Sequence, residues 1–107
     1  MIYEMRMYEV LPGRMPAMHA RFQNHTLGFF KKHGIKVIGF WEAEVGTSGV
    51  LNYMVAFDDL AHRERAWASL GADKDWQRVR DESHRDGQIV ARIRSEIWRP
   101  TPYSPLQ

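Results

Sequence analysis

Two kinds of periodicity follow one another along the chain, and their order limits the fold more than any single motif does. Side chains that alternate between two faces indicate strands, and apolar residues three or four positions apart indicate helices. The pattern predicts strands at residues 2–10, 36–44, 50–58 and 88–98. It predicts helical regions at residues 15–33 and 60–84, the second with a break at GADKDW. The expected order is therefore β–α–β–β–α–β.

This order is that of the split βαβ unit of ferredoxin-like folds. We therefore predict the α+β class, with an antiparallel sheet that carries both helical regions on one face. The first and last strands are expected side by side in the middle of that sheet. With 107 residues, the chain is long enough for one hydrophobic core and one domain. That domain is predicted to cover residues 1–99, followed by a proline-rich tail without regular structure at residues 100–107.

Composition excludes several kinds of site. The chain has no cysteine, which excludes disulfides, thiolate metal sites and cysteine nucleophiles and fits a reducing compartment. No apolar run reaches the roughly 20 residues that a membrane-spanning helix needs, so no membrane span is expected. The first residues alternate as a strand and do not resemble a presequence. Together these observations predict a cytoplasmic location.

The net charge is +2, and charges of both signs are closely interleaved. In residues 62–87, HRERAWASLGADKDWQRVRDESHRDG, acids and bases are mixed almost residue by residue. Such mixing is typical of solvated helix faces with local ion pairs. A single-stranded nucleic acid would instead need an unopposed basic groove with interleaved aromatic side chains. We therefore expect no nucleic-acid partner.

The first strand, IYEMRMYEV, has one mostly apolar face and one mixed face. The apolar face holds Tyr3, Met5, Met7 and Glu9, and the mixed face holds Ile2, Glu4, Arg6, Tyr8 and Val10. The last strand divides in the same way, with its isoleucines on one face and charged residues with Trp98 on the other. We expect the apolar faces beneath the helices and the mixed faces on the far side of the sheet. There Glu4 and Arg6 would meet cross-strand partners of suitable charge, namely Arg92, Arg94 and Glu96.

The predicted far side also carries apolar side chains, among them Met54 and Val90. A small monomer seldom leaves such an area in water, so a second copy of the same sheet is the expected cover, which gives a two-fold homodimer. The polar cluster at this dimer face is predicted to be Glu4, Arg6, Tyr8, Arg92, Arg94 and Glu96, with its charges paired in the buried seam. In the alternative interpretation, Arg6 holds an anionic ligand group while Tyr8 and Glu4 donate and accept a proton.

A ligand pocket is predicted between the first helical region and the sheet. The apolar stripe of this helix passes through His25 or Thr26 and then Phe29, and an inward His25 would lie near Trp41 and Tyr53. The pocket candidates are therefore His25, Phe29, Trp41 and Tyr53, with His25 as the candidate catalytic base or haem ligand. The alternative is a core histidine that hydrogen-bonds to a neighbour. No two histidines are four positions apart, so no metal site is predicted, and no cofactor is expected.

Several short motifs are spread over nearly the whole chain. They are Y-E-x-R-x-Y at 3–8, PG at 12–13, KKHG at 31–34, V-x-G-F-W at 37–41, E-x-G at 44–46, an acidic helix start at 58–60 and D-x-x-W at 73–76. In order and spacing they resemble the NIPSNAP family, and the chain looks like a short, bacterial-type, single-domain member. The resemblance implies a dimeric α+β barrel in which two ferredoxin-like sheets face each other.

The resemblance implies little about activity. Eukaryotic members are associated with mitochondria and with vesicular or mitophagy-related interactions, whereas many bacterial members have no assigned reaction. Related barrels include monooxygenases, haem-degrading enzymes and lactone isomerases, which is an analogy of fold alone.

Two functional hypotheses follow, and the sequence does not decide whether the protein is an enzyme. In the first, which we favour, the chain binds or converts a small hydrophobic or aromatic molecule in the predicted pocket. Conversion would be a cofactor-independent oxygenation or a proton transfer. In the second, the chain is a non-enzymatic protein-interaction module whose main chemistry is dimerisation.

Overall fold

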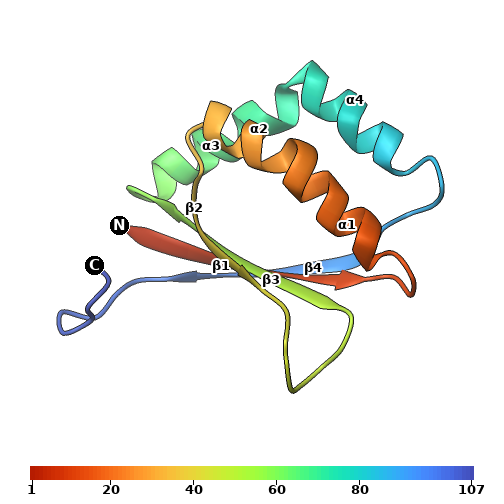
Figure 1. Ribbon diagram of the computed structural model, residues 1–107. Helices are drawn as coiled ribbons and strands as arrows, with labels where there is room; N and C mark the ends of the chain where they lie inside the picture. Colours follow the sequence, from red (N-terminus) through yellow and green to blue (C-terminus); the bar gives the residue numbers. More distant parts are fainter.

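An antiparallel sheet forms one layer of the computed structural model, which describes residues 1–107, and all the helices lie on one face of this sheet (Figure 1). The strands are β1 (Ile2–Val10), β2 (Lys36–Trp41), β3 (Val50–Phe57) and β4 (Val90–Trp98). The helices are α1 (Met15–Arg21), the π-helical turn η1 (Phe22–Thr26), α2 (Leu27–Lys32), α3 (Leu60–Ala72) and α4 (Lys74–Ser83). None of them is long and apolar enough to cross a membrane. The predicted α+β class and ferredoxin-like order of elements are confirmed.

The strand order in the sheet is β2–β3–β1–β4, and all neighbouring strands are antiparallel. The first and last strands are neighbours, as predicted, but only β1 lies in the middle of the sheet. β4 is an edge strand, so the prediction that it is central is wrong. The centre is formed by β1 and β3, and their helix-facing side chains therefore occupy the middle of the layer between sheet and helices.

The first helical region stays on the sheet because it contains η1. Buried residues follow one another at intervals of four, and they are Met18, Phe22, Thr26 and Phe30. In a regular α-helix, each such step rotates the side chain by about 40° around the axis. In η1, the Leu27 N–H donates to the Phe22 carbonyl oxygen five residues earlier, and this wider turn removes part of the rotation. Phe30 therefore still faces the core.

The same turn places Thr26, and not His25, on the buried stripe. The Thr26 hydroxyl donates to the Arg21 carbonyl oxygen at 3.2 Å, in the core beneath η1. Adjacent positions of a helix point in very different directions, so only one of the two side chains can face the sheet. His25 is exposed to solvent. The prediction of an inward His25 near Trp41 and Tyr53 is therefore wrong.

The two faces of β1 are the reverse of the prediction. Paired residues in an antiparallel ladder share a face of the sheet. Arg6 is paired with Tyr53 and Tyr8 with Leu51, and both partners are buried in the core beneath the helices. Glu4, Arg6 and Tyr8 therefore point toward the helices, and the methionine face of β1 points away from them.

The isoleucine face of β4 has the predicted orientation, because Ile93 is paired with Tyr8 on the helix-facing side. Its charged face is on the outer side of the sheet, where the paired residues are Glu9, Met7 and Met5. The predicted pairing of Glu4 and Arg6 with Arg92, Arg94 and Glu96 is therefore wrong, since the two groups are on opposite sides of the sheet. On the outer side, Arg92 Nε lies 3.0 Å from Glu9 Oε2.

Asp73 connects α4 to the end of α2. Its carboxylate caps α4 by accepting the backbone N–H groups of Asp75 at 2.9 Å and Trp76 at 3.3 Å. It also accepts a hydrogen bond from Lys32 Nζ at 2.8 Å and lies 2.7 Å from His33 Nε2. Hydrogen bonds from Lys32 and His33 outweigh burial and hold the pKa of Asp73 well below its ordinary value.

Asp73→Asn should lower the melting temperature at neutral pH, because the amide keeps the helix cap but loses the ionic contacts. Asp73→Ala should lower it further, since the cap is lost as well. The pKa of Asp73 is depressed in the folded protein, so its stabilisation is present above the ordinary value of 3.8 and is lost as the pH falls toward the folded value.

The measurement is thermal unfolding followed by circular dichroism over a range of pH. The difference between the parent protein and Asp73→Asn should shrink below about pH 4. Asp75→Asn, which changes an exposed carboxylate on the same helix, is the control. Equal losses from the two asparagine variants at neutral pH would contradict the role assigned to Asp73.

Candidate functional site

Glu4 is a fully buried charged group, with 0% of its side chain exposed. Its carboxylate accepts hydrogen bonds from Arg63 Nε at 2.7 Å and Nη2 at 3.2 Å, from Trp67 Nε1 at 2.9 Å and from Arg6 Nη1 at 3.0 Å. Burial alone would raise the pKa of Glu4, but these donors outweigh it and hold the pKa below its ordinary value. Glu4 is therefore an ionised group that joins β1 to α3. Because its carboxylate oxygens already accept four hydrogen bonds from the protein, Glu4 is poorly suited to accept a proton from a ligand.

The Arg6 guanidinium connects Glu4 to two tyrosines. Its Nε donates to Tyr53 Oη at 2.7 Å and its Nη2 to Tyr8 Oη at 3.4 Å, and the two hydroxyl oxygens are 2.8 Å apart. The guanidinium carbon lies 4.5 Å from the centroid of the Trp67 ring, within range of a cation–π contact. We call this set of side chains (Glu4, Arg6, Tyr8, Tyr53 and Trp67) the Glu4 network. It is a continuous polar chain beneath the helices.

A cleft of about 370 Å³ opens beside the Glu4 network, between the helices and the side of the sheet formed by β1 and β4. We call it the helix–sheet cleft. Its apolar lining includes Phe22, Phe30, Trp67, Trp76 and Ile93. Its polar lining includes Arg6 and Tyr8 from the sheet, Arg21 from α1 and Arg80 from α4. An apolar cavity of this size with a few polar groups is typical of small-molecule sites.

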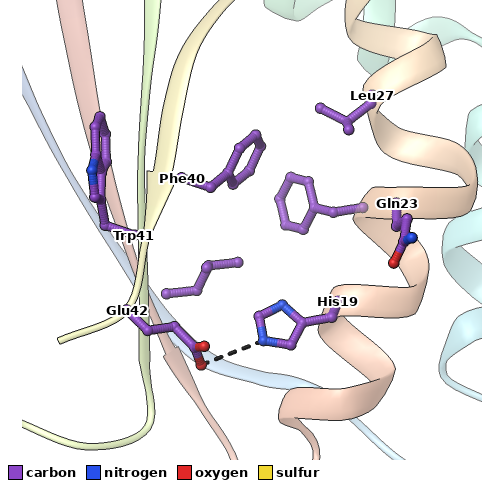
Figure 2. Close-up of a pocket in the computed structure, with 8 residues that line it drawn as sticks. His19, Gln23, Leu27, Phe40, Trp41 and Glu42 are labelled. Atoms are coloured by element: carbon purple, nitrogen blue, oxygen red, sulfur yellow. Dashed lines mark ion pairs between the residues drawn. The ribbon is translucent and has the colours of Figure 1, made fainter. Parts of the chain in front are cut away.

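The predicted pocket residues do not come together around one cavity. Tyr53 is fully buried within the Glu4 network, and Phe29 packs against Trp76 with ring centroids 5.6 Å apart. Trp41 is 49% exposed and lies on the opposite side of β2 from Phe40 (Figure 2). His25 is at the solvent-facing surface of η1.

A second groove, of about 280 Å³, lies between α1–η1 and β2 (Figure 2). Phe22, Phe40 and Leu51 contribute apolar side chains to it. At its rim, His19 Nε2 lies 3.4 Å from Glu42 Oε1, and both side chains are half-exposed. These two groups are already paired with each other in contact with solvent. The helix–sheet cleft, which has buried polar groups, is therefore the stronger candidate site.

Three residues of the cleft are absent from the sequence-based prediction, namely Arg21, Trp67 and Arg80, and so is Arg63, which donates to Glu4. The interleaved charges of residues 62–87 are typical of a solvated helix, so nothing in this pattern distinguishes Arg63, which points inward from α3, from its exposed neighbours. Arg63 and Trp67 are four positions apart and so share a helix face. Arg21, three positions after Met18, falls on the apolar stripe of α1, and an arginine in such a stripe is the feature that could have indicated it. The structure contains no group of three or more histidine, aspartate or glutamate side chains that could hold a metal ion.

Comparison with known proteins identifies the family that shares this fold. The family model described as NIPSNAP matches residues 3–105. The chain belongs to the NIPSNAP family. The resemblance seen in the short motifs is thereby confirmed, and the match covers both the Glu4 network and the helix–sheet cleft.

Solved NIPSNAP structures have the same fold over most of their length. A NIPSNAP domain protein from Burkholderia xenovorans is 26% identical with a TM-score of 0.86, over 98% of this chain and 99% of that chain. A NIPSNAP family protein from Agrobacterium tumefaciens is 27% identical with a TM-score of 0.88, over 100% of this chain and 94% of that chain. Protein NipSnap homolog 1 of Danio rerio is 28% identical over an alignment of 109 residues that covers 99% of this chain and 36% of the relative. The chain therefore spans about a third of the length of this longer relative.

Glu4→Gln should lower the free energy of unfolding by about 3 kcal/mol, because it leaves Arg6 and Arg63 without their buried negative partner. The measurement is urea unfolding followed by circular dichroism. The control is Glu9→Gln on the outer face of the same strand, where an exposed pair with Arg92 should contribute less than about 1 kcal/mol. A loss at Glu4 no larger than that at Glu9 would contradict the role of the Glu4 network.

Proposed function

We propose that this NIPSNAP-family chain binds a small hydrophobic or aromatic molecule in the helix–sheet cleft. The observation that carries the proposal is the aromatic lining of a space of about 370 Å³ on which a few polar side chains converge. The lining differs from the one that the sequence predicts, since Arg6 and Tyr8 replace His25 and Trp41. We place this activity in the cytoplasm, in keeping with the absence of cysteine.

The Glu4 network supports the proposal because it orients the polar wall of the cleft in advance. Arg6 is held by Glu4 on one side and by Tyr53 on the other, so its guanidinium needs no rearrangement to meet a ligand. Tyr8 lines the cleft, and its hydroxyl is oriented by Tyr53 and Arg6. If the bound molecule is converted, Tyr8 is the group placed to exchange a proton with it.

We also propose that the outer face of the sheet is the interface of a homodimer, as in a dimeric α+β barrel. Trp41 and Trp98 are 49% and 45% exposed, and both project from the outer face. Met5 and Met7 project from β1 on the same face. An apolar area of this kind favours a protein interface over contact with water. The charged residues of this interface would be Arg92, Arg94 and Glu96, together with Glu9.

Gly71→Phe tests the binding proposal by adding a bulky side chain at a residue that lines the cleft. In a thermal-shift screen of hydrophobic and aromatic metabolites, compounds that bind the native cleft should raise the melting temperature of the parent protein. Gly71→Phe should abolish these shifts. The control is Gly28→Phe: at both helical glycines an added Cβ would meet no heavy atom within 4 Å, but only Gly71 lines the cleft.

Two results would contradict the binding proposal. Shifts that persist in Gly71→Phe would place the binding elsewhere on the chain. A complete absence of shifts would favour the alternative function, a non-enzymatic interaction module.

Trp98→Glu tests the homodimer. The parent protein should sediment as a dimer at micromolar concentration, and the variant should sediment as a monomer because a charge enters an apolar interface. The control is Leu60→Glu, an exposed apolar position in the helical layer, which should leave the dimer intact. A monomeric parent protein in sedimentation equilibrium would overturn this part of the proposal.

A further inference from the structure

We infer that the molecule bound in the helix–sheet cleft carries a carboxylate, and that Arg21 holds it. This inference rests on the proposed binding function and names the chemical class of the ligand. The ligand would be a monocarboxylic acid with an apolar or aromatic body.

The first observation is the charge of the cleft. Its lining includes three arginines, Arg6, Arg21 and Arg80, and no aspartate or glutamate. The charge of Arg6 is compensated by Glu4 at 3.0 Å, behind the wall of the cleft. Arg80 is half-exposed, and its Nε lies 3.6 Å from Asp81 Oδ1. Arg21 is therefore the one arginine of the cleft that is both buried and uncompensated by a carboxylate.

The second observation is the incomplete hydrogen bonding of Arg21. The residue is only 9% exposed, and its Nη1 donates to Ser83 Oγ at 3.2 Å. Its Nε is buried without any hydrogen-bond partner. A buried donor without an acceptor is costly, and few such groups occur in native proteins. Burial, and to a smaller extent the nearby Arg80, lowers the pKa of Arg21, although Tyr8 and Tyr53 act in the opposite direction.

These observations point to a carboxylate as the ligand group. A guanidinium presents a planar set of donors that matches a carboxylate, and a carboxylate in the cleft would accept from the terminal N–H groups of Arg21 and neutralise its charge. A single negative charge balances the single uncompensated arginine. The aromatic rings that surround the cleft, Trp67 and Trp76 among them, suit the apolar body of such an acid.

The test uses a matched pair of probes, 2-naphthylacetate and its neutral amide, 2-naphthylacetamide. Their affinities for the full chain are measured by isothermal titration calorimetry at pH 7. The parent protein should bind the acid roughly tenfold more tightly than the amide, as a charge-assisted hydrogen bond in a buried site provides. Arg21→Gln should remove this preference and leave the affinity for the amide unchanged.

Two further variants separate ligand binding from folding. Arg78→Gln removes an exposed arginine of α4 outside the cleft and should behave as the parent protein does. Arg21→Lys keeps the charge but loses the planar donors, so it should retain part of the acid preference and is informative where Arg21→Gln is unstable. Because the Arg21 guanidinium is buried and incompletely bonded, Arg21→Gln should not lower the melting temperature as Glu4→Gln does.

The outcomes distinguish this inference from the function on which it rests. Equal affinities for acid and amide in the parent protein, or an acid preference that survives in Arg21→Gln, would overturn the inference. If the amide still binds and Gly71→Phe abolishes that binding, the binding function stands without the carboxylate. If neither probe binds, the inference is overturned, and the thermal-shift screen decides the binding function separately.

Discussion

The rest of the structure depends on the burial of one carboxylate, that of Glu4, between the sheet and the helices. A charged group without contact to water is stable only when hydrogen bonds replace its hydration. Arg63 and Trp67 supply these bonds from α3, and Arg6 supplies another from β1 itself. Because the three donors come from two elements, the carboxylate determines which face of β1 is buried and how α3 is rotated about its axis.

This arrangement also explains the uneven distribution of charge in the helix–sheet cleft. Glu4 does not line the cleft, and its carboxylate neutralises the charge of Arg6. The hydroxyl of Tyr8 is hydrogen-bonded to Tyr53 and Arg6. Arg21 reaches the cleft from α1 and forms no ion pair with a carboxylate, and no aspartate or glutamate lines the cleft. The Glu4 network and Arg21 therefore have different roles. The network supports the fold and one wall of the cleft, and Arg21 is the group left for an anionic ligand.

The α+β class and the adjacency of β1 and β4 could be predicted, but the central place of β3 and the orientation of β1 could not. Both faces of IYEMRMYEV mix apolar and polar side chains, and a shift of one residue in register interchanges them. If the more apolar face is assumed to be buried, the face of Met5 and Met7 is chosen, since it carries less charge. The hydrogen-bond donors that α3 provides for Glu4 cannot be recognised from the strand's own sequence. For the same reason Arg63 and Trp67 are missing from the predicted site, although their spacing places them on one helix face.

The sequence by itself determined the four strands, the two helical regions, their order and the membership of the NIPSNAP family, because these follow from local periodicity and from short motifs in a set order. Only the tertiary structure decided which face of β1 is buried, because that choice depends on its pairing with β3 and on donors from α3, far away in the chain. Only the structure decided between His25 and Thr26, because a single π-helical turn changes the phase of the apolar stripe. The cleft at Arg21 likewise exists only where the helices, which come from two separate parts of the chain, meet β1 and β4.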